Sequence, residues 1–302
     1  MTVKSYTAAA TVDEAVAAMA AGARPVAGGT DLVVGARQGK APLPESLVAI
    51  HRLDQLRGIE VTDGRDLRIG ALVTHEELAD HPVVRDRFTA LADAAAVVGS
   101  HATRAQGTIG GNVMNASPAM ETGGPLVCFG ATVTLRSAKG SREVPVADLL
   151  VGPGQTTADA GELLTAVDVP ATAAGTVSCY LRLEYRRQME IAVVGATAVV
   201  TLDGKKVTDA RIAITALAPT IHRVAEAEAA LVGTDGGRKA AEAAAAAAAA
   251  GAAPISDVRA SATYRRAMAA VIVRRAIEAA LARARGETVS VPASLTLHGG
   301  AS

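Results

Sequence analysis

The sequence is poor in aromatic residues and in cysteine. It has no tryptophan, four tyrosines and two phenylalanines among 302 residues, so any flat ligand must stack on tyrosine, phenylalanine or aliphatic side chains. The two cysteines, Cys128 and Cys179, each lie in an apolar run, and no C-x-x-C pair occurs. A cluster held by four thiolates is therefore excluded for this chain alone. We expect both thiols to be buried and unreactive.

The chain also lacks a net charge and a membrane-spanning run. Thirty basic residues balance thirty acidic ones, so no overall field favours nucleic acid or an anionic membrane. No apolar stretch approaches the roughly 18 residues of a transmembrane span, and the alanine run 243–250 predicts a helix outside the membrane. The N-terminal sequence MTVKSYTAAATVDEA has no long apolar segment typical of a signal peptide. We therefore expect a cytoplasmic protein without nucleic-acid partners.

Common nucleotide and metal motifs are missing as well. No G-x-G-x-x-G opens a helix after a strand, and the segment 35–40 is one residue short of a Walker loop, with Ala41 where that loop has Ser or Thr. The histidines show no metal-ligand spacing, and we expect none of these five to bind a metal: His51, His75, His81, His101 and His222. Only His101 precedes a glycine-rich segment closely enough to be a candidate neighbour of a bound cofactor.

Capping and periodicity predict an α+β protein. The capping box Thr11–Glu14 predicts a helix over 11–21, and a second such spacing opens a helix at Thr74. Further predicted elements are strands over 25–27, 47–50, 66–69, 131–136 and 143–146, a helix over 87–98, and a polar, glycine-rich loop over 99–124.

The character of the sequence changes near Pro170. A run of strands follows, with a hairpin at Asp203-Gly204, and helices are predicted over 225–252 and 261–285. We therefore predict an N-terminal domain over 1–172 with subdomains over about 1–56 and 57–172, a C-terminal domain over 173–288, and a tail over 289–302.

Two glycine pairs are the strongest chemical signal. They lie in Ala27-Gly-Gly-Thr-Asp31 and in Gly107-Thr-Ile-Gly-Gly-Asn112. Glycine lets main-chain N–H groups approach a diphosphate that side chains would block, and threonine and asparagine add donors beside them. A tight turn explains either pair equally well, so the spacing leaves both interpretations open.

These segments resemble the two FAD diphosphate loops of the flavoprotein subunit of molybdenum hydroxylases, the family of xanthine dehydrogenase and carbon monoxide dehydrogenase. The resemblance rests on AGGTDL (27–32) and TIGGN (108–112), in this order. It continues through NASP (115–118) with Glu121, GPGQTTADAGELLTAVDVP (152–170) and RLEYRRQMEIAVV (182–194). It spans most of the chain up to about residue 200.

The resemblance implies a vanillyl-alcohol-oxidase type FAD domain of two subdomains, followed by a domain with a small antiparallel sheet and helices. It implies that two segments hold the diphosphate, that Glu121 and Arg182 lie near the flavin half, and that Leu163 or Leu164 lines the ring. The implied FAD-binding residues are Pro25, Val26, Ala27, Gly28, Gly29, Thr30, Asp31, Leu32, Thr108, Ile109, Gly110, Gly111, Asn112, Glu121, Leu163, Leu164 and Arg182.

The sequence departs from the family pattern at three positions, where the family has Asp for Glu121, Lys for Arg182 and Asp for Glu190. Simpler roles stay open for the charged residues: Glu121 could cap a turn, Arg182 could be an outward-facing strand residue, and Asp31 could cap the following helical turn. Arg186 and Arg187 are interpreted as surface or subunit-contact charges.

The resemblance further implies an electron-transfer subunit with no catalytic side chain, since the chemistry belongs to the flavin. A small subunit with [2Fe–2S] clusters and a large molybdopterin subunit would complete a dimer of heterotrimers. Electrons would leave to an external acceptor. Two alternatives are a stand-alone FAD-dependent reductase of the enolpyruvyl type, disfavoured by the match over 182–194, and a scaffold subunit that has lost FAD, disfavoured by the retained glycines.

Overall fold

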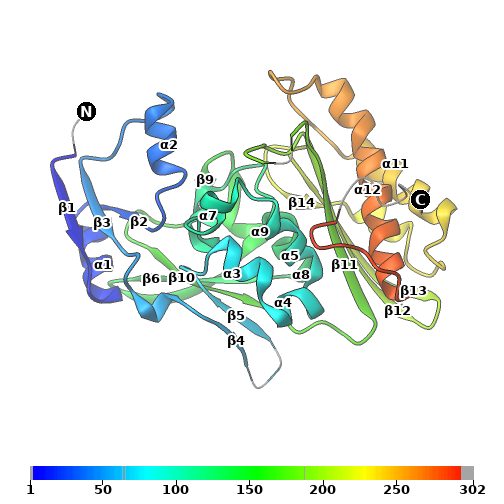
Figure 1. Cartoon of the computed structure of the whole chain (residues 1–302), viewed down its shortest axis with the longest axis horizontal. Helices are drawn as coiled ribbons and strands as arrows, with labels where there is room; N and C mark the ends of the chain where they lie inside the picture. The colour runs from blue at the N-terminus through cyan, green and yellow to red at the C-terminus, as the bar shows by residue number, and fades with distance from the viewer. Residues whose placement is uncertain (1–2, 63, 65, 187, 294–302) are drawn as a thin grey trace. The chain divides into compact units, whose positions relative to one another are not determined.

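The computed structural model describes residues 3–62, 64, 66–186 and 188–293, and the chain divides into two compact units (Figure 1). Unit 1 consists of Met1–His75, His101–Ala116 and Ala131–Ala171; unit 2 consists of Glu76–Ser100, Ser117–Gly130 and Thr172–Ser302. Each unit thus combines stretches that are distant in sequence. The predicted linear boundaries near residues 56, 172 and 288 stay predictions.

Unit 1 contains a small parallel sheet with one helix packed on it. Strands β1 (Ser5–Ala8), β3 (Ser46–Ala49) and β2 (Arg24–Val26) pair in this order. Helix α1 (Val12–Ala20) begins after Thr11, whose hydroxyl accepts a hydrogen bond from the Glu14 N–H. The capping box thus marks the helix start as predicted.

A five-stranded antiparallel sheet forms the second part of unit 1. Its strands are, in spatial order, β4 (Ile59–Val61), β5 (Leu67–Gly70), β10 (Leu163–Val169), β6 (Thr132–Ser137) and β7 (Gly140–Pro145). A bulge interrupts the β10–β6 pairing between Leu164 and Ala166. Short elements complete the unit: 3-10 helix η1 (Asp54–Leu56), helices α2 (Leu32–Arg37), α6 (His101–Arg104), α7 (Ile109–Asn115) and α9 (Val146–Leu149), and the strand pair β8 (Leu150–Gly152) and β9 (Gln155–Thr156).

The prediction of one loop over residues 99–124 is wrong. Helices α6 and α7 lie within it, and α8 (Gly123–Phe129) begins before its end. Glycine weakens an isolated helix, but Thr108 caps α7 by accepting a hydrogen bond from the Gly111 N–H. Tertiary packing against Gly110 stabilises this turn where the local sequence disfavours it.

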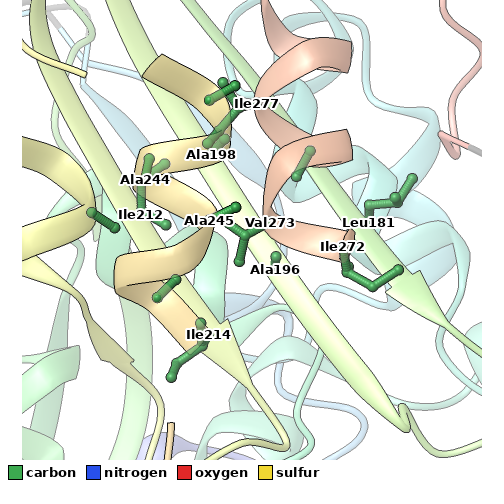
Figure 2. Packing of buried hydrophobic residues seen from close by; sticks show 14 of the residues in the cluster. Leu181, Ala196, Ala198, Ile212, Ile214, Ala244, Ala245, Ile272, Val273 and Ile277 are labelled. Atoms are coloured by element: carbon green, nitrogen blue, oxygen red, sulfur yellow. The ribbon is translucent and has the colours of Figure 1, made fainter. Parts of the chain in front are cut away.

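Unit 2 is built on an antiparallel sheet with helices on both faces. Strands β11 (Thr176–Leu183), β12 (Val194–Asp203), β13 (Lys206–Thr215) and β14 (His222–Arg223) pair in chain order. Helices α11 (Arg238–Ala250) and α12 (Ala262–Ala284) cover one face (Figure 1). Figure 2 shows Ile272 of α12 near Leu181 of β11, while Val273 and Ile277 lie near Ala196 and Ala198 of β12.

The small side chains of α11 explain this close packing. Ala241, Ala244, Ala245 and Ala248 are buried at helical spacing, so the alanine-rich stretch forms an apolar stripe without bulk. Within the described residues, no helix combines the length and the apolar character needed to cross a membrane.

The opposite face of the same sheet contacts α5 (Thr89–Ala96) and α8. The two cysteines lie in unit 2, Cys128 on α8 and Cys179 on β11, and both are free and buried. Burial raises the pKa of both thiols, which favours the protonated, poorly nucleophilic form. The predicted burial of both cysteines is confirmed.

Two helix predictions differ from the structure. The helix predicted over 87–98 is shorter and corresponds to α5, and a separate helix, α4 (Pro82–Arg87), precedes it; the helix predicted to open at Thr74 is α3 (His75–Asp80). The helix predicted over 225–252 is divided into α10 (Ala225–Ala229) and α11, because Gly233 and Gly236 adopt positive φ angles of 86° and 67° between them. The predicted tail is described only up to residue 293, and residues 294–302 lie outside the described part.

A buried ion pair ties the end of α12 to α5 in unit 2. Asp93 is fully buried and accepts hydrogen bonds from Arg283 Nη1 at 2.7 Å and Nη2 at 2.9 Å. The N–H groups of Tyr180 and Ala293 also donate to this carboxylate, both at 3.1 Å. Burial raises the pKa of Asp93 while Arg283 opposes the shift; with four donors around it, we take the carboxylate as ionised.

We expect Asp93→Ala to lower the free energy of unfolding by about 3–5 kcal/mol, because it leaves the Arg283 charge buried without its partner. Glu278→Ala on the same helix removes the partly exposed Arg274–Glu278 pair and should cost less than about 1 kcal/mol. Urea denaturation followed by circular dichroism measures both. Equal losses for the two variants would contradict the central role of the Asp93–Arg283 pair.

Candidate functional site

The first glycine segment presents a row of unused main-chain donors. It joins β2 to α2, and Gly29 adopts a positive φ of 68°, which glycine allows without strain. Within the residues described by the structure, the N–H groups of Gly28, Gly29, Thr30 and Asp31 donate to no protein acceptor. Successive free N–H groups in such a bend suit an anion such as a diphosphate.

The second glycine segment packs directly against the first. A Cβ added to Gly28 would overlap the Gln106 carbonyl oxygen, and one added to Gly107 would lie 3.3 Å from Thr30 Oγ1. The two segments therefore touch through main chain and short side chains. This is the convergence that one shared dinucleotide requires.

The main-chain donors of the second segment are already engaged inside unit 1. The N–H groups of Ile109 and Gly110 donate to Val73 O at 2.9 Å and to Ala71 O at 3.0 Å. Those of Gly111 and Asn112 donate to the hydroxyl and the carbonyl of Thr108. A Cβ added to Gly110 would lie 2.7 Å from Ala71 O. Gly110 is therefore needed so that two parts of the protein can pack closely. The sequence analysis had explained this glycine by the approach of a phosphate.

The two segments therefore differ in the donors that they leave unused. The first leaves main-chain N–H groups, and the second leaves the proton of the Thr108 hydroxyl, whose oxygen accepts from Gly111. Donors without acceptors beside main chain that a Cβ would block fit the diphosphate of a dinucleotide. Whether each residue of 25–32 and 108–112 touches the cofactor stays a prediction.

Asp31 occupies the N-cap position of α2 but makes no side-chain capping bond, so the alternative that it caps the turn is wrong. Partial burial raises the pKa of its carboxyl, and the charge of Lys40 opposes this shift. The side chain remains available to a ligand.

Glu121 and Arg182 form a buried ion pair in unit 2. Their exposed fractions are 7% and 5%, and Arg182 Nη1 donates to Glu121 Oε1 at 2.7 Å. Arg182 Nε also donates to Glu184 Oε2 at 2.6 Å, and Nη1 lies 3.3 Å from the Glu190 carbonyl. The alternative of an outward-facing Arg182 is therefore wrong.

The charges around Arg182 do not balance. Burial raises the pKa of Glu121, and Arg182 acts in the opposite direction. Since arginine stays protonated in proteins and lies 2.7 Å from the carboxylate, we take the pair as ionised. If Glu184 is ionised too, Glu121 and Glu184 together carry one more negative charge than Arg182 supplies, so these three side chains have a net negative charge, unlike a lone lysine.

The two predicted ring-lining leucines are covered by protein in unit 1. Leu163 packs in the core with Val16 and Met19 of α1, and Leu164 is only 3% exposed. The bulge beside them in β10 turns successive residues inward. A flavin contact by either leucine stays a prediction.

Two histidines, His101 and His75, lie close to the second glycine segment in sequence or in space. His101 is exposed, and Arg104 Nη2 lies 3.1 Å from its Nδ1. His75 lies in no motif that would have selected it, and it lies next to the second segment, where its main-chain N–H donates to the Gly107 carbonyl at 3.0 Å. No local pattern marks this residue, because the Thr74–Thr108 bridge that brings it there is a tertiary contact.

Other predicted features are less informative. Arg186 is mainly exposed and its Nη2 donates to the Met189 carbonyl, while Arg187 lies outside the described residues. In the described ranges, no group of three or more His, Cys, Asp or Glu side chains is arranged to hold a metal ion.

Comparison with known proteins gives a consistent result along the chain. The family model described as the FAD binding domain in molybdopterin dehydrogenase matches residues 2–172, and that of the CO dehydrogenase flavoprotein C-terminal domain matches residues 180–280. The chain is 34% identical to the carbon monoxide dehydrogenase medium chain of Afipia carboxidovorans over 87% of its own length and 90% of that protein.

Two further relatives extend the comparison. The xanthine dehydrogenase FAD-binding subunit of Escherichia coli O157:H7 is 29% identical, covering 94% of this chain and 98% of that one. A solved chain of carbon monoxide dehydrogenase from Hydrogenophaga pseudoflava superposes with a TM-score of 0.88 at 35% identity, over 92% of this chain and 97% of that one.

We expect Gly28→Ala to weaken FAD binding at least about tenfold, because the added Cβ forces the two segments apart and displaces the free N–H groups. Gly35→Ala is the matched control: a Cβ there meets nothing within 4 Å, and alanine favours the helix. Titration of each apoprotein with FAD, followed by flavin fluorescence, compares them. Wild-type affinity for Gly28→Ala would contradict the contact between the segments.

His75 should also make stability depend on pH. Burial, and then the Arg104 charge, lower its pKa from 6.5 to about 4. Below pH 6.5 the unfolded chain takes up a proton that the folded chain refuses, so this contribution is complete above pH 6.5 and is lost as the pH falls toward 4.

Between pH 7 and pH 4 we expect the wild type to lose on the order of 3 kcal/mol more unfolding free energy than His75→Gln. Urea titrations across this range measure the difference. Parallel pH profiles for the two proteins would show that His75 is not held neutral.

Proposed function

This chain belongs to the FAD-binding flavoprotein subunits of the molybdenum hydroxylases, and we propose that it takes electrons from [2Fe–2S] clusters of a partner subunit and passes them to an external acceptor. The single observation that carries the proposal is the row of free N–H groups at 28–31, packed against the second glycine segment. A chain of this family with that arrangement is equipped to hold a dinucleotide.

Bound FAD would supply a redox centre that accepts and releases electrons. The protein's own groups bind and orient it: the segment 25–32 and the segment 108–112 hold the diphosphate, the first mainly by main-chain N–H groups and the second by the Thr108 hydroxyl. We place Glu121 and Arg182 beside the flavin half, with Leu163 or Leu164 near the ring. No side chain is assigned as nucleophile or proton donor.

The Glu121–Arg182–Glu184 group would tune the flavin by its charge. A lone cation beside the flavin would stabilise an anionic reduced form. Here two carboxylates lie on one guanidinium, so the three side chains have a net negative charge and would not stabilise an anionic reduced form. This supports a flavin that releases its electrons readily to the next carrier.

The partners follow from what this chain lacks. Its two cysteines are buried and far too few for the iron–sulfur relay, and relatives are named as a medium chain or as a subunit of a dehydrogenase complex. We propose an iron–sulfur small subunit and a molybdopterin large subunit, assembled as a dimer of heterotrimers. Two free thiols suit a reducing compartment, and we place the complex in the cytoplasm.

The relatives are named for different substrates, including carbon monoxide, xanthine and nicotinate. Such variety within one flavoprotein family fits a substrate that is recognised on the large subunit. We therefore propose that this chain passes the electrons to the external acceptor. The division into domains over residues 1–172 and 173–288 is also part of the proposal.

The test purifies the complex through a tag on this chain, from cells that express it with the genes of its partner subunits. We expect FAD, molybdenum and iron to copurify. After anaerobic reduction with a stoichiometric amount of dithionite, the acceptor is added and the flavin and iron–sulfur absorbances are followed in stopped flow. The Gly28→Ala complex, depleted of FAD, should reoxidise its clusters at least about tenfold more slowly.

Other outcomes would overturn the proposal. Rapid reoxidation of the clusters without FAD would remove this chain from the electron path. Flavin with NAD(P)H turnover and no partners would favour the stand-alone reductase, and no flavin in any preparation would favour the scaffold.

A further inference from the structure

His75 is a buried side chain without a partner, next to the contact between the two glycine segments. It is 2% exposed, and its Nδ1 is buried and has no hydrogen-bond partner. Its Cδ2 lies 3.4 Å from the position that a Cβ on Gly107 would occupy, and Thr30 Oγ1 lies 3.3 Å from that same position. The Cδ2 atom of the imidazole, to which Nε2 is bonded, therefore lies beside the glycine that joins the segments.

The surroundings decide which ring nitrogen carries the proton. The nearby Arg104 charge and the burial of the ring both favour neutral imidazole. An unpaired buried N–H costs more than an unpaired lone pair, and a lone pair at Nδ1 also suits the positive potential of Arg104. The proton then resides on Nε2. In the described part of the chain the buried ring nitrogen without a partner is Nδ1, so Nε2–H is the ring group left to meet a ligand or water.

We propose that His75 is a further cofactor-binding residue whose neutral Nε2–H donates a hydrogen bond to an oxygen in the diphosphate-ribose part of the FAD held at 28–31. The inference rests on the proposed FAD site. It adds a side-chain donor from beneath the second segment, where the main-chain N–H groups are engaged with Ala71, Val73 and Thr108. A neutral donor holds an oxygen without changing the net charge at the site.

The simpler role is a core histidine whose Nε2–H meets a water molecule. The two roles differ in what FAD does to the ring. A water-bound Nε2–H would be indifferent to the cofactor, whereas a bound FAD oxygen would shield the proton and fix the ring.

The first experiment measures FAD dissociation constants on the full chain by flavin fluorescence. His75→Phe keeps an aromatic ring and removes the donor, and we expect it to weaken binding about 10-fold to 100-fold, the range for one lost hydrogen bond to a charged group. His75→Gln carries an N–H near the position of Nε2 and should recover most of the affinity. His81→Phe is the control, since His81 also has an unpartnered Nδ1 but belongs to unit 2.

The results for the wild type and the variants distinguish failure of this inference from failure of the proposed function. If the wild type and its complex bind no FAD, the proposed function fails. If the wild type binds FAD and His75→Phe binds equally tightly, only the inference is overturned. An equal loss in His75→Phe and His75→Gln would assign a packing role and overturn it as well.

A measurement on the unaltered chain covers the case in which the variants do not fold. In protein labelled with ¹⁵N-histidine, FAD should shift the Nε2–H resonance of His75 and slow its exchange with water. An unchanged shift and exchange rate on saturation with FAD would overturn the inference.

Discussion

The candidate FAD site depends on the close approach of the Gly28 main chain to the Gln106 carbonyl. A side chain at Gly28 would overlap the Gln106 carbonyl oxygen, so the contact constrains where the N–H groups of the first segment point. The N–H groups of the second segment are consumed in anchoring it to residues 71–73. A rigid second segment thus supports a first segment that keeps its donors free, and pre-organised donors bind an anion without a large entropic cost.

The glycines of the two segments are therefore not all explained by contact with a phosphate. A motif of two glycine pairs suggests that both pairs touch a phosphate. In the structure Gly28 and Gly110 are required because protein backbone lies where a Cβ would be, while Gly29 is required by its positive φ. The motif is therefore as much a packing signature as a ligand signature, and a ligand can use only the donors that packing leaves unpaired.

Two buried ion pairs fix local arrangements in unit 2. The Asp93–Arg283 and Glu121–Arg182 pairs both lie at strand β11: Arg283 also donates to the Ser178 carbonyl, and Arg182 belongs to the strand. Such pairs add little net stability compared with apolar contacts, but removing one partner is costly. They consequently fix particular arrangements: the first holds the end of α12 and residue 293 to α5, and the second surrounds the Arg182 guanidinium with oxygen atoms.

Local signals in the sequence were enough to predict several elements. Capping boxes at Thr11 and Thr74 marked the starts of α1 and α3, Asp203-Gly204 marked a hairpin, and the apolar runs around the cysteines predicted their burial. The α+β class and the family followed from such motifs in order.

Contacts between distant parts of the chain set the remaining features. It showed that residues 99–124 contain helices, that Gly233 and Gly236 separate two helices, and that His75 rather than His101 lies under the second segment. It also showed which N–H groups stay free. The reason is that hydrogen-bond partners and burial come from chain segments far apart in sequence, and no local pattern records which of them will meet.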